Sequence, residues 1–410
     1  MSHTSLIDLP SLDPHYMSPE KNHGQSVAEK AQSTLPLGRT FGQHNPGQRT
    51  LDRVQKAYDA LYQLTQLDAA YSIFYCHSFA MAQAHALFSV YMDYGRKCGR
   101  GHFIASKCAC GPVVMQLERL CELGASFDLV QMHSGGGLDI EHLKSLITPR
   151  TQMISLALVD AHSGIILELE AIRQICADRG IFLHLDLSHA WYQLPDKMSH
   201  LASLGADLMT IDGYTCGASF GGALLITRPG MRLEPLLPSG PPLLSYLDVK
   251  PTLIWDLVVA LEHSLKQSAA TSMRLAGKKS RFEKKLIEAF EEYKLPTPLF
   301  PFSKSYRSKK NLKDLSCAPS QNLILFPSMH NEHLAFLLAE KNLSFSLGGG
   351  PSQQLHYFLR DCHFPALLHH SGISLRLDPR LSGQDIDKIT QTIAQCAQIA
   401  HQSAFEMEVN

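Results

Sequence analysis

Short apolar runs alternate with helical patterns along most of the chain, and this alternation constrains the fold more than any other feature of the sequence. The runs that we expect to form strands cover residues 71–75, 102–105, 127–132, 153–159 and 181–185. The intervening segments 79–94, 113–123, 140–147 and 168–178 carry apolar residues at helical spacing. Strands separated by helices of about 10 to 15 residues are typical of βαβ units. The sequence therefore predicts an α/β fold with a mainly parallel sheet.

Residues 204–226, reading LGADLMTIDGYTCGASFGGALLI, lie at the centre of this pattern. Two apolar runs without helical periodicity flank a polar segment, and such runs are typical of strands buried on both faces. We expect the polar segment, residues 212–219, to be a loop at a strand end. Because open α/β sheets place ligands at strand ends, this loop is the first candidate for a functional site.

The 410 residues suit a large domain and a smaller one. Residues 1–45 contain four prolines and little periodicity, which predicts an extended arm. We expect residues 46–290 to form a large α/β domain and residues 291–410 a small α+β domain, with a long helix over 252–293 as the connector. In the small domain the patterns predict strands at 322–326 and 373–377 and helices at 332–340 and 384–401.

The composition is that of an ordinary cytosolic enzyme-sized protein. A net charge of −1 with 18% charged residues gives no indication of nucleic-acid or membrane-surface binding. The apolar runs are shorter than the roughly 18 residues that span a bilayer, so we expect a cytoplasmic protein. We expect the ten cysteines to be reduced thiols, since the chain is long and shows no secretory context. The 21 histidines are scattered along the chain, so no metal-binding repeat is visible.

Three segments resemble the cysteine desulfurase branch of the class V aminotransferases, which are fold-type I enzymes that use pyridoxal phosphate. Residues 159–166, VDAHSGII, resemble the family's Val-Asn-Asn-Glu-Ile-Gly-Val-Val segment. Residues 180–190, GIFLHLDLSHA, resemble its strand ending in His-Val-Asp-Ala-x-Gln-Ser, and residues 207–215, DLMTIDGYT, resemble its Asp-Leu-Met-Ser-Phe-Ser-Gly-His-Lys. The resemblance covers residues 38–399. It implies a fold-type I PLP-transferase-like fold, a dimer and an ancestral cofactor pocket.

The third segment ends in Thr215, where the family has the lysine that forms a Schiff base with the cofactor. A hydroxyl cannot form an imine. The sequence contains no lysine between Lys197 and Lys250 that could replace it. The resemblance therefore leaves the catalytic residues unknown and predicts that no cofactor is bound covalently at this position.

The resemblance also assigns a remnant cofactor pocket. Asp186 matches the carboxylate that pairs with the pyridine nitrogen of the cofactor, and His189 replaces a glutamine that would bond the ring hydroxyl. Cys110 replaces the histidine that stacks on the ring. Tyr214 precedes the lysine position and is a weak base at neutral pH. The last member of the predicted pocket is Asp212, in place of a phosphate-binding serine.

The expected phosphate site departs from the family in other ways. His77 and Ser78, followed by Phe79, match the phosphate loop and place bulk where backbone amides approach the anion. Asp248 falls near the position where the partner subunit supplies a threonine. Together with Asp212, it would repel a dianionic phosphate.

Two further family features are absent or ambiguous. Residues 347–354, LGGGPSQQ, match the loop that bears the persulfide cysteine but contain no cysteine. The arginine that binds the substrate carboxylate could be Arg376 or Arg380, because an ungapped match places Ser374 there.

Three hypotheses follow. The first is a non-catalytic relative of the cysteine desulfurases that acts as a binding or partner subunit, in a homodimer or in a heterodimer with an active homologue. The second is an enzyme that holds pyridoxal or pyridoxamine phosphate without a covalent bond, on Asp186. The third is a metal site that uses the histidines, cysteines and Asp186 of the pocket, although no metal-binding spacing is present and we predict no metal.

Overall fold

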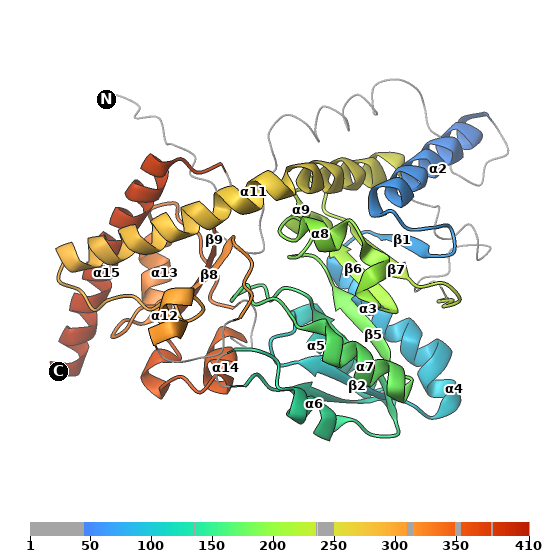
Figure 1. Ribbon diagram of the computed structural model, residues 1–410, viewed down its shortest axis with the longest axis horizontal. Coiled ribbons are helices and arrows are strands. Elements are labelled where there is room, and N and C mark those ends of the chain that lie inside the picture. Colours follow the sequence, from blue (N-terminus) through green and yellow to red (C-terminus); the bar gives the residue numbers. More distant parts are fainter. Residues whose placement is uncertain are drawn as a thin grey trace.

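The computed structural model describes residues 45–133, 136–234, 236, 250–309, 315–348, 354–378 and 380–409. The predicted arm over residues 1–45 lies outside the described residues, apart from Asn45. Asp248 and most of the loop 347–354 lie outside them as well. The chain builds a large sheet and a small one, joined by a long helix (Figure 1).

The large sheet has seven strands in the order β1-β7-β6-β5-β4-β2-β3. Its strands are β1 (Ser72–Cys76), β2 (His102–Ser106), β3 (Ser126–Val130), β4 (Thr151–Ala157), β5 (Phe182–Asp186), β6 (Leu208–Asp212) and β7 (Ala223–Thr227). The five strands from β6 to β3 are parallel, whereas β7 runs antiparallel to both β6 and β1. The predicted mainly parallel α/β sheet is confirmed.

Helices cover both faces of this sheet. The helices of this part of the chain are α2 (Asn45–Thr65), α3 (Phe79–Ser89), η1 (Val90–Gly95), α4 (Arg96–Cys98), α5 (Gly111–Cys121), α6 (Ile140–Leu146), α7 (Leu169–Arg179), α8 (Pro195–Met198) and η2 (Leu201–Leu204). On one face, the apolar side chains of α3 and α5 pack on the sheet; on the other, those of α2 and α7 do. Alternate residues of each strand point to the two faces, as Ile73 and Phe74 do in β1.

The segment after β6 differs from the predicted loop. Residues Gly213–Cys216 form one helical turn, α9, which begins at Asp212 and ends at Gly217 in the left-handed conformation. Four residues are too few to show a helical period in the sequence. The turn is instead stabilised by the Asp212 side chain, which accepts hydrogen bonds from the backbone of α9.

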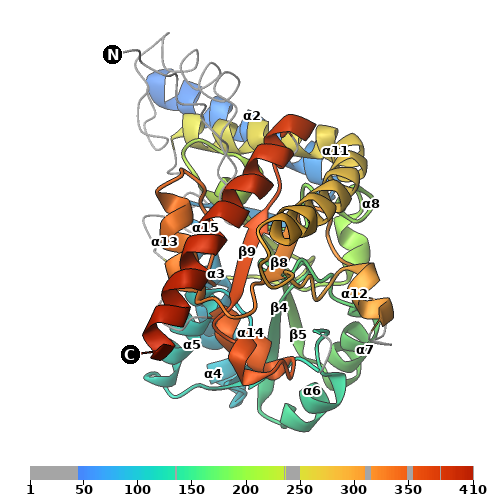
Figure 2. The same cartoon turned by 90° about the vertical axis from the view of Figure 1, so that its left-hand side faces the viewer.

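The long connector is α11, which spans Pro251–Glu292, close to the predicted 252–293. Its first half packs into the core of the large sheet through Ile254 and Leu261, and its second half contributes Phe282 to a separate core. Figure 2 shows α11 lying beside the C-terminal helix. None of the described helices is both long and apolar enough to cross a membrane.

The second core surrounds a two-stranded antiparallel sheet. Its strands are β8 (Gln321–Leu325) and β9 (Gly372–Arg376), and its helices are α12 (Lys304–Lys309), α13 (Asn331–Ala339), α14 (Gln354–Asp361), η3 (Ala366–Leu368) and α15 (Gly383–Val409). The middle of β9 contacts the segment that follows β4, where Ser374 Oγ donates a hydrogen bond to the carbonyl oxygen of His162 over 2.9 Å. This contact fixes the small sheet beside the strand ends described next.

Candidate functional site

A pocket of about 490 Å³ lies at the carboxyl ends of β4, β5 and β6. The lining residues are Phe79, Cys108, Cys110, Ala157, Val159, Ala161, His162, Asp186, Ser188, His189, Asp212 and Thr215. None of these twelve described residues is a lysine or an arginine. The lining therefore offers carboxylates, imidazoles, thiols and hydroxyls.

The structure brings together five of the residues that the sequence singled out. Cys110, Asp186, His189, Asp212 and Thr215 all line this pocket. They converge because four of them follow or end parallel strands whose carboxyl ends share one edge of the sheet. The arrangement follows from the topology and does not by itself assign a role to any of them.

Asp186 and Asp212 end neighbouring strands and are linked through one hydroxyl. Asp186 Oδ1 accepts hydrogen bonds from the backbone N–H of Ser188, over 2.9 Å, and from its hydroxyl. The same Ser188 oxygen accepts the backbone N–H of Asp212 over 2.9 Å. The pKa of Asp186 is raised from its usual value of 3.8 to about 6: burial raises it most, the bonds from Ser188 lower it, and the nearby Asp212 makes a smaller upward contribution.

Asp212 holds the start of α9. Its carboxylate accepts the backbone N–H groups of Tyr214 and Thr215 over 3.3 and 3.1 Å, and the Thr215 hydroxyl donates to Oδ2 over 2.5 Å. Thr215 is buried, whereas the Tyr214 side chain turns outward and is 51% exposed. Tyr214 therefore does not line the pocket.

The segment before α3 does not supply the pocket with polar groups. The Ser78 hydroxyl accepts the backbone N–H of Met81 over 3.2 Å and so caps the helix. His77 and Ser78 are both exposed and lie outside the lining, in which Phe79 takes their place. The sequence alone indicates for Phe79 only the bulk that it adds to the expected phosphate loop.

The thiols at the pocket are protonated groups. Burial and the charge of Asp186 raise the pKa of Cys110 to about 12, and burial together with the charge of Asp160 raises the pKa of Cys108 well above its usual range. A thiol is nucleophilic only as the thiolate. These cysteines are therefore unsuited to attack a substrate.

His189 connects the pocket to a buried polar cluster between the segment that follows β5 and the first residue of β8. One of its ring nitrogens, Nδ1, lies 3.2 Å from the Gln321 side-chain nitrogen, which also lies 3.0 Å from the Tyr192 hydroxyl. Gln193 joins the same cluster through a 2.6 Å bond to Gln321. The cluster fixes the orientation of the His189 ring at the pocket wall.

Arg376 is the candidate arginine that approaches the pocket. Its buried guanidinium lies 3.8 Å from the centre of the Tyr192 ring, and Nη1 donates to the carbonyl oxygen of Thr215 over 3.4 Å. Arg380 is exposed and pairs with Asp378.

Sequence reasoning did not assign pocket positions to Ser188, Cys108 or Ala161. Ser188 lies two residues after Asp186, a spacing at which a strand-end carboxylate commonly bonds the following turn. That spacing was a usable signal for Ser188. The metal hypothesis gains no support, since the described residues contain no group of three His, Cys, Asp or Glu side chains placed to hold a metal ion.

The profile of the aminotransferase class-V family matches residues 26–245, which is more than half of the 410 residues. The chain belongs to the aminotransferase class-V family. In this class-V protein, the matched region contains every strand of the large sheet and every residue that lines the pocket.

Known relatives of the class-V protein are cysteine desulfurases. Cysteine desulfurase IscS of Ehrlichia chaffeensis is 34% identical over 114 residues, which is 27% of each chain. Cysteine desulfurase IscS of Serratia proteamaculans is 27% identical over 221 residues, 52% of this chain and 53% of the relative. The match thus spans between about a quarter and about half of the length of these relatives.

A solved structure described as a NifS-like protein superposes on the class-V chain with a TM-score of 0.79. The superposition covers 94% of this chain and 98% of the other, at 14% sequence identity. A likeness at this identity concerns the fold. It confirms the predicted fold-type I PLP-transferase-like architecture.

Proposed function

We propose that this chain is a class-V family member without cysteine desulfurase activity, which acts as a binding or partner subunit. The observation that carries the proposal is the Thr215–Asp212 pair. By the sequence resemblance, Thr215 occupies the position of the Schiff-base lysine, and its hydroxyl is held 2.5 Å from a carboxylate. A hydroxyl in this position cannot form an imine with an aldehyde.

The pocket also fits the phosphate of pyridoxal phosphate poorly. Asp186 would suit the ring nitrogen of the cofactor. However, Asp212 stands where the family has a phosphate-binding serine, and neither lysine nor arginine is present among the described lining residues. A carboxylate facing a dianion in a sheltered pocket is repulsive. We therefore derive no chemical step through this cofactor.

A role as a partner subunit agrees with the surface beside the pocket. Tyr214 and Phe220 are 51% and 48% exposed, although both are large apolar side chains. Exposed apolar groups of this kind are typical of interaction surfaces when they lie together. Tyr214 belongs to α9, and Phe220 lies in the short segment between α9 and β7. The partner would be a second copy of this chain or an active homologue.

The decisive experiment is an absorption spectrum from 300 to 500 nm of the purified full chain, before and after pyridoxal phosphate and then borohydride. We expect no reducible band, and no sulfide or alanine from added cysteine. The Thr215→Lys variant is the matched control, because it restores the amine. A reducible band on a lysine of the unaltered chain, or release of sulfide, would overturn the proposal.

The retained Asp186 favours one alternative, an enzyme that holds pyridoxal or pyridoxamine phosphate non-covalently. Burial raises the pKa of this carboxylate, and a protonated pyridine nitrogen beside it would supply a counter-charge. In that case either cofactor form would bind with an absorption band that borohydride does not trap on the protein. The Asp186→Asn variant would lose the band.

A further inference from the structure

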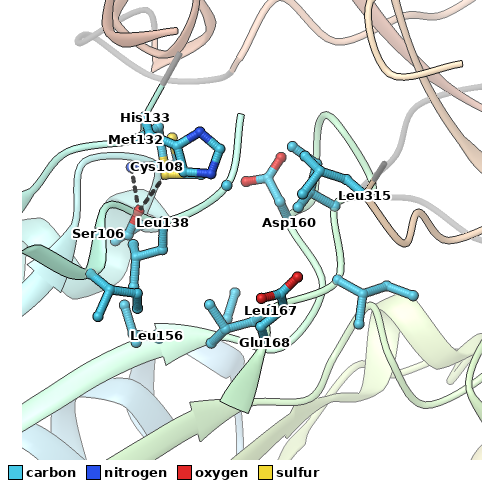
Figure 3. Close-up of a pocket in the computed structure, with 16 residues that line it drawn as sticks. Ser106, Cys108, Met132, His133, Leu138, Leu156, Asp160, Leu167, Glu168 and Leu315 are labelled. Carbon is cyan, nitrogen blue, oxygen red and sulfur yellow. Dashed lines mark hydrogen bonds between the residues drawn. The ribbon is translucent and has the colours of Figure 1, made fainter. Parts of the chain in front are cut away.

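His189 lines the candidate pocket, and the position of its ring proton decides which hydrogen bonds it makes there. In a neutral imidazole one nitrogen donates and the other accepts. The neighbouring cavity shown in Figure 3, lined by Ser106, Met132 and Leu156 among others, does not include His189. Of the two spaces, the ring therefore borders only the candidate pocket.

A row of buried polar side chains leads to this ring. It consists of Gln193, Ser320 and Gln321, none of which is more than 2% exposed. Gln193 belongs to the segment that follows β5, whereas Ser320 directly precedes β8 and Gln321 is its first residue. Buried polar groups are almost always hydrogen-bonded, so the orientation of each amide is set by the groups around it.

Two backbone groups fix the orientation of the Gln193 amide. The backbone N–H of Ser320 donates to Gln193 Oε1 over 3.0 Å, and Gln193 Nε2 donates to the carbonyl oxygen of His189 over 2.8 Å. A backbone N–H only donates and a carbonyl oxygen only accepts. If the amide were reversed, two donors would meet at one end and two acceptors at the other. The Gln193 amide therefore has one allowed orientation.

The Gln193 amide in turn fixes the Gln321 amide. Gln193 Nε2 donates its other proton to Gln321 Oε1 over 2.6 Å. The Ser320 hydroxyl lies 2.7 Å from the same oxygen and 2.6 Å from Gln193 Oε1, so it finds an acceptor in either direction. Reversal of the Gln321 amide would bring two NH₂ groups within hydrogen-bond distance of each other. Its Nε2 end therefore faces away from Gln193.

The Gln321 amide leaves His189 Nδ1 only the role of an acceptor. Gln321 Nε2 lies 3.2 Å from His189 Nδ1 and 3.0 Å from the Tyr192 hydroxyl. An amide NH₂ group has two protons to donate and does not accept. A proton on Nδ1 would point at this donor. In the neutral ring the proton therefore lies on Nε2.

Other contacts keep the Gln321 amide beside the ring. Lys279 Nζ, on α11, donates to the backbone carbonyl oxygen of Gln321 over 2.9 Å. Gln321 also pairs with Arg376 of β9 in the small sheet. Three segments that are far apart in the sequence thus hold this one residue against His189.

We propose that Gln193 and Gln321 are positioning residues that hold His189 in the neutral form protonated at Nε2, so that His189 meets a ligand of the pocket as a hydrogen-bond donor. The ligand atom that it bonds is then an acceptor, such as a carbonyl oxygen. The class of ligand rests on the proposed binding role. The position of the proton is a property of the chain itself.

The test is the ¹⁵N spectrum of the histidine side chains in the full chain, labelled with ¹⁵N-histidine, at about pH 8, which is above the usual histidine range. A ring nitrogen without a proton resonates far downfield of a nitrogen that carries one. Correlations to the carbon-bound ring protons distinguish Nδ1 from Nε2. The His189→Gln variant assigns the signals, because it removes those of His189. We expect Nδ1 of His189 to be the downfield nitrogen.

Two variants test the relay through the amides. Gln321→Glu replaces the donor at Nδ1 by an acceptor of the same shape, so a proton should move to Nδ1 and its downfield signal should be lost. Gln193→Glu has no bond to the ring nitrogens, but it removes the donor that orients Gln321. The Gln321 amide should then reverse, and the downfield Nδ1 signal should again be lost. Gln384→Glu, at an exposed position near the start of α15, is the matched control and should keep it.

The proposal is overturned if Nδ1 of His189 carries the proton in the unaltered chain, a result that needs no variant to fold. It is also overturned if either Gln321→Glu or Gln193→Glu, when folded, retains the downfield Nδ1 signal as Gln384→Glu does. The cofactor spectrum tests the proposed function separately. A reducible band there would leave the position of the His189 proton untouched, and a protonated Nδ1 would leave the cofactor spectrum unchanged.

Discussion

Thr215 Oγ1 donates a hydrogen bond to Asp212 Oδ2 over 2.5 Å, which joins the last residue of β6 to the third residue of α9. The same carboxylate accepts the backbone N–H groups of Thr215 and Tyr214. One side chain thus satisfies three donors at the start of α9. The Thr215 hydroxyl therefore stabilises the turn through this hydrogen bond and is not a free nucleophile.

This relationship predicts the effect of Thr215→Val, which removes the hydroxyl and keeps the branched shape. Because a hydrogen bond to a charged acceptor contributes more than a neutral one, the free energy of unfolding should fall by about 1.5 kcal/mol. The urea midpoint of the full chain measures the change. Thr392→Val is the control, since its exposed hydroxyl donates only to the Lys388 carbonyl. Equal midpoints for the two variants would contradict the assigned bond.

The raised pKa of Asp186 predicts a dependence of stability on pH. Its folded value of about 6 exceeds the usual 3.8, so the folded state holds the proton more tightly than the unfolded state does. Stability from this group is therefore greatest at low pH and is lost as the pH rises through about 4 to 6. In the unaltered chain, this group alone should lower the unfolding free energy by roughly 1–2 kcal/mol between pH 5 and pH 8.

The Asp186→Asn variant tests this sign. It keeps an oxygen for the Ser188 donors and removes the titration, so it should gain stability relative to the unaltered chain at pH 8 more than at pH 5. Urea unfolding at both pH values gives the comparison. Asp178→Asn, at an exposed position of α7, should show no such pH-dependent gain. A gain at pH 5 larger than that at pH 8 would reverse the assigned direction.

The strands of the large sheet could be predicted from the sequence because each is a short apolar run with a clear boundary. α9 could not, since its four residues carry no period and depend on the Asp212 side chain. The antiparallel placement of β7 between β1 and β6 was also not specified. The placement of β7 depends on its pairing with strands that are far away in the sequence, and the local pattern of apolar residues does not specify which strands pair.

Only part of the candidate site could be predicted from the sequence. Residues that follow parallel strands, such as Asp186 and Asp212, reach one pocket because the topology places strand ends together. His77 and Tyr214 do not line it, because the side-chain direction depends on the capped turn in which each residue sits. The cavity lined by Ser106, Met132 and Leu156, among others, had no linear signal. Its residues come from the ends of β2, β3 and β4 and from Leu315, which is far along the chain.

The position of Arg376 predicts that lysine cannot replace it. Its planar guanidinium stacks 3.8 Å from the centre of the Tyr192 ring and also donates to the Thr215 carbonyl. Lysine lacks the planar group that makes both contacts. Arg376→Lys should therefore lower the free energy of unfolding by about 2 kcal/mol, the scale of a desolvated cation–π contact. In the same urea titration, Arg380→Lys should be nearly neutral, because Arg380 is exposed, and a comparable loss in both variants would contradict the assignment.

The thiols offer a direct test of whether the pocket retains sulfur chemistry. With a pKa of about 12, only about one Cys110 in ten thousand is a thiolate at pH 8, and alkylation requires the thiolate. Peptide mass spectrometry after brief iodoacetamide treatment should therefore show Cys98, which is exposed, labelled roughly 100-fold faster than Cys110. In urea the difference should disappear, because burial and the charge of Asp186 no longer act on the thiol. Rapid labelling of Cys110 in the folded chain would show a thiolate in the pocket and would argue for a retained sulfur-transfer reaction, against the function proposed above.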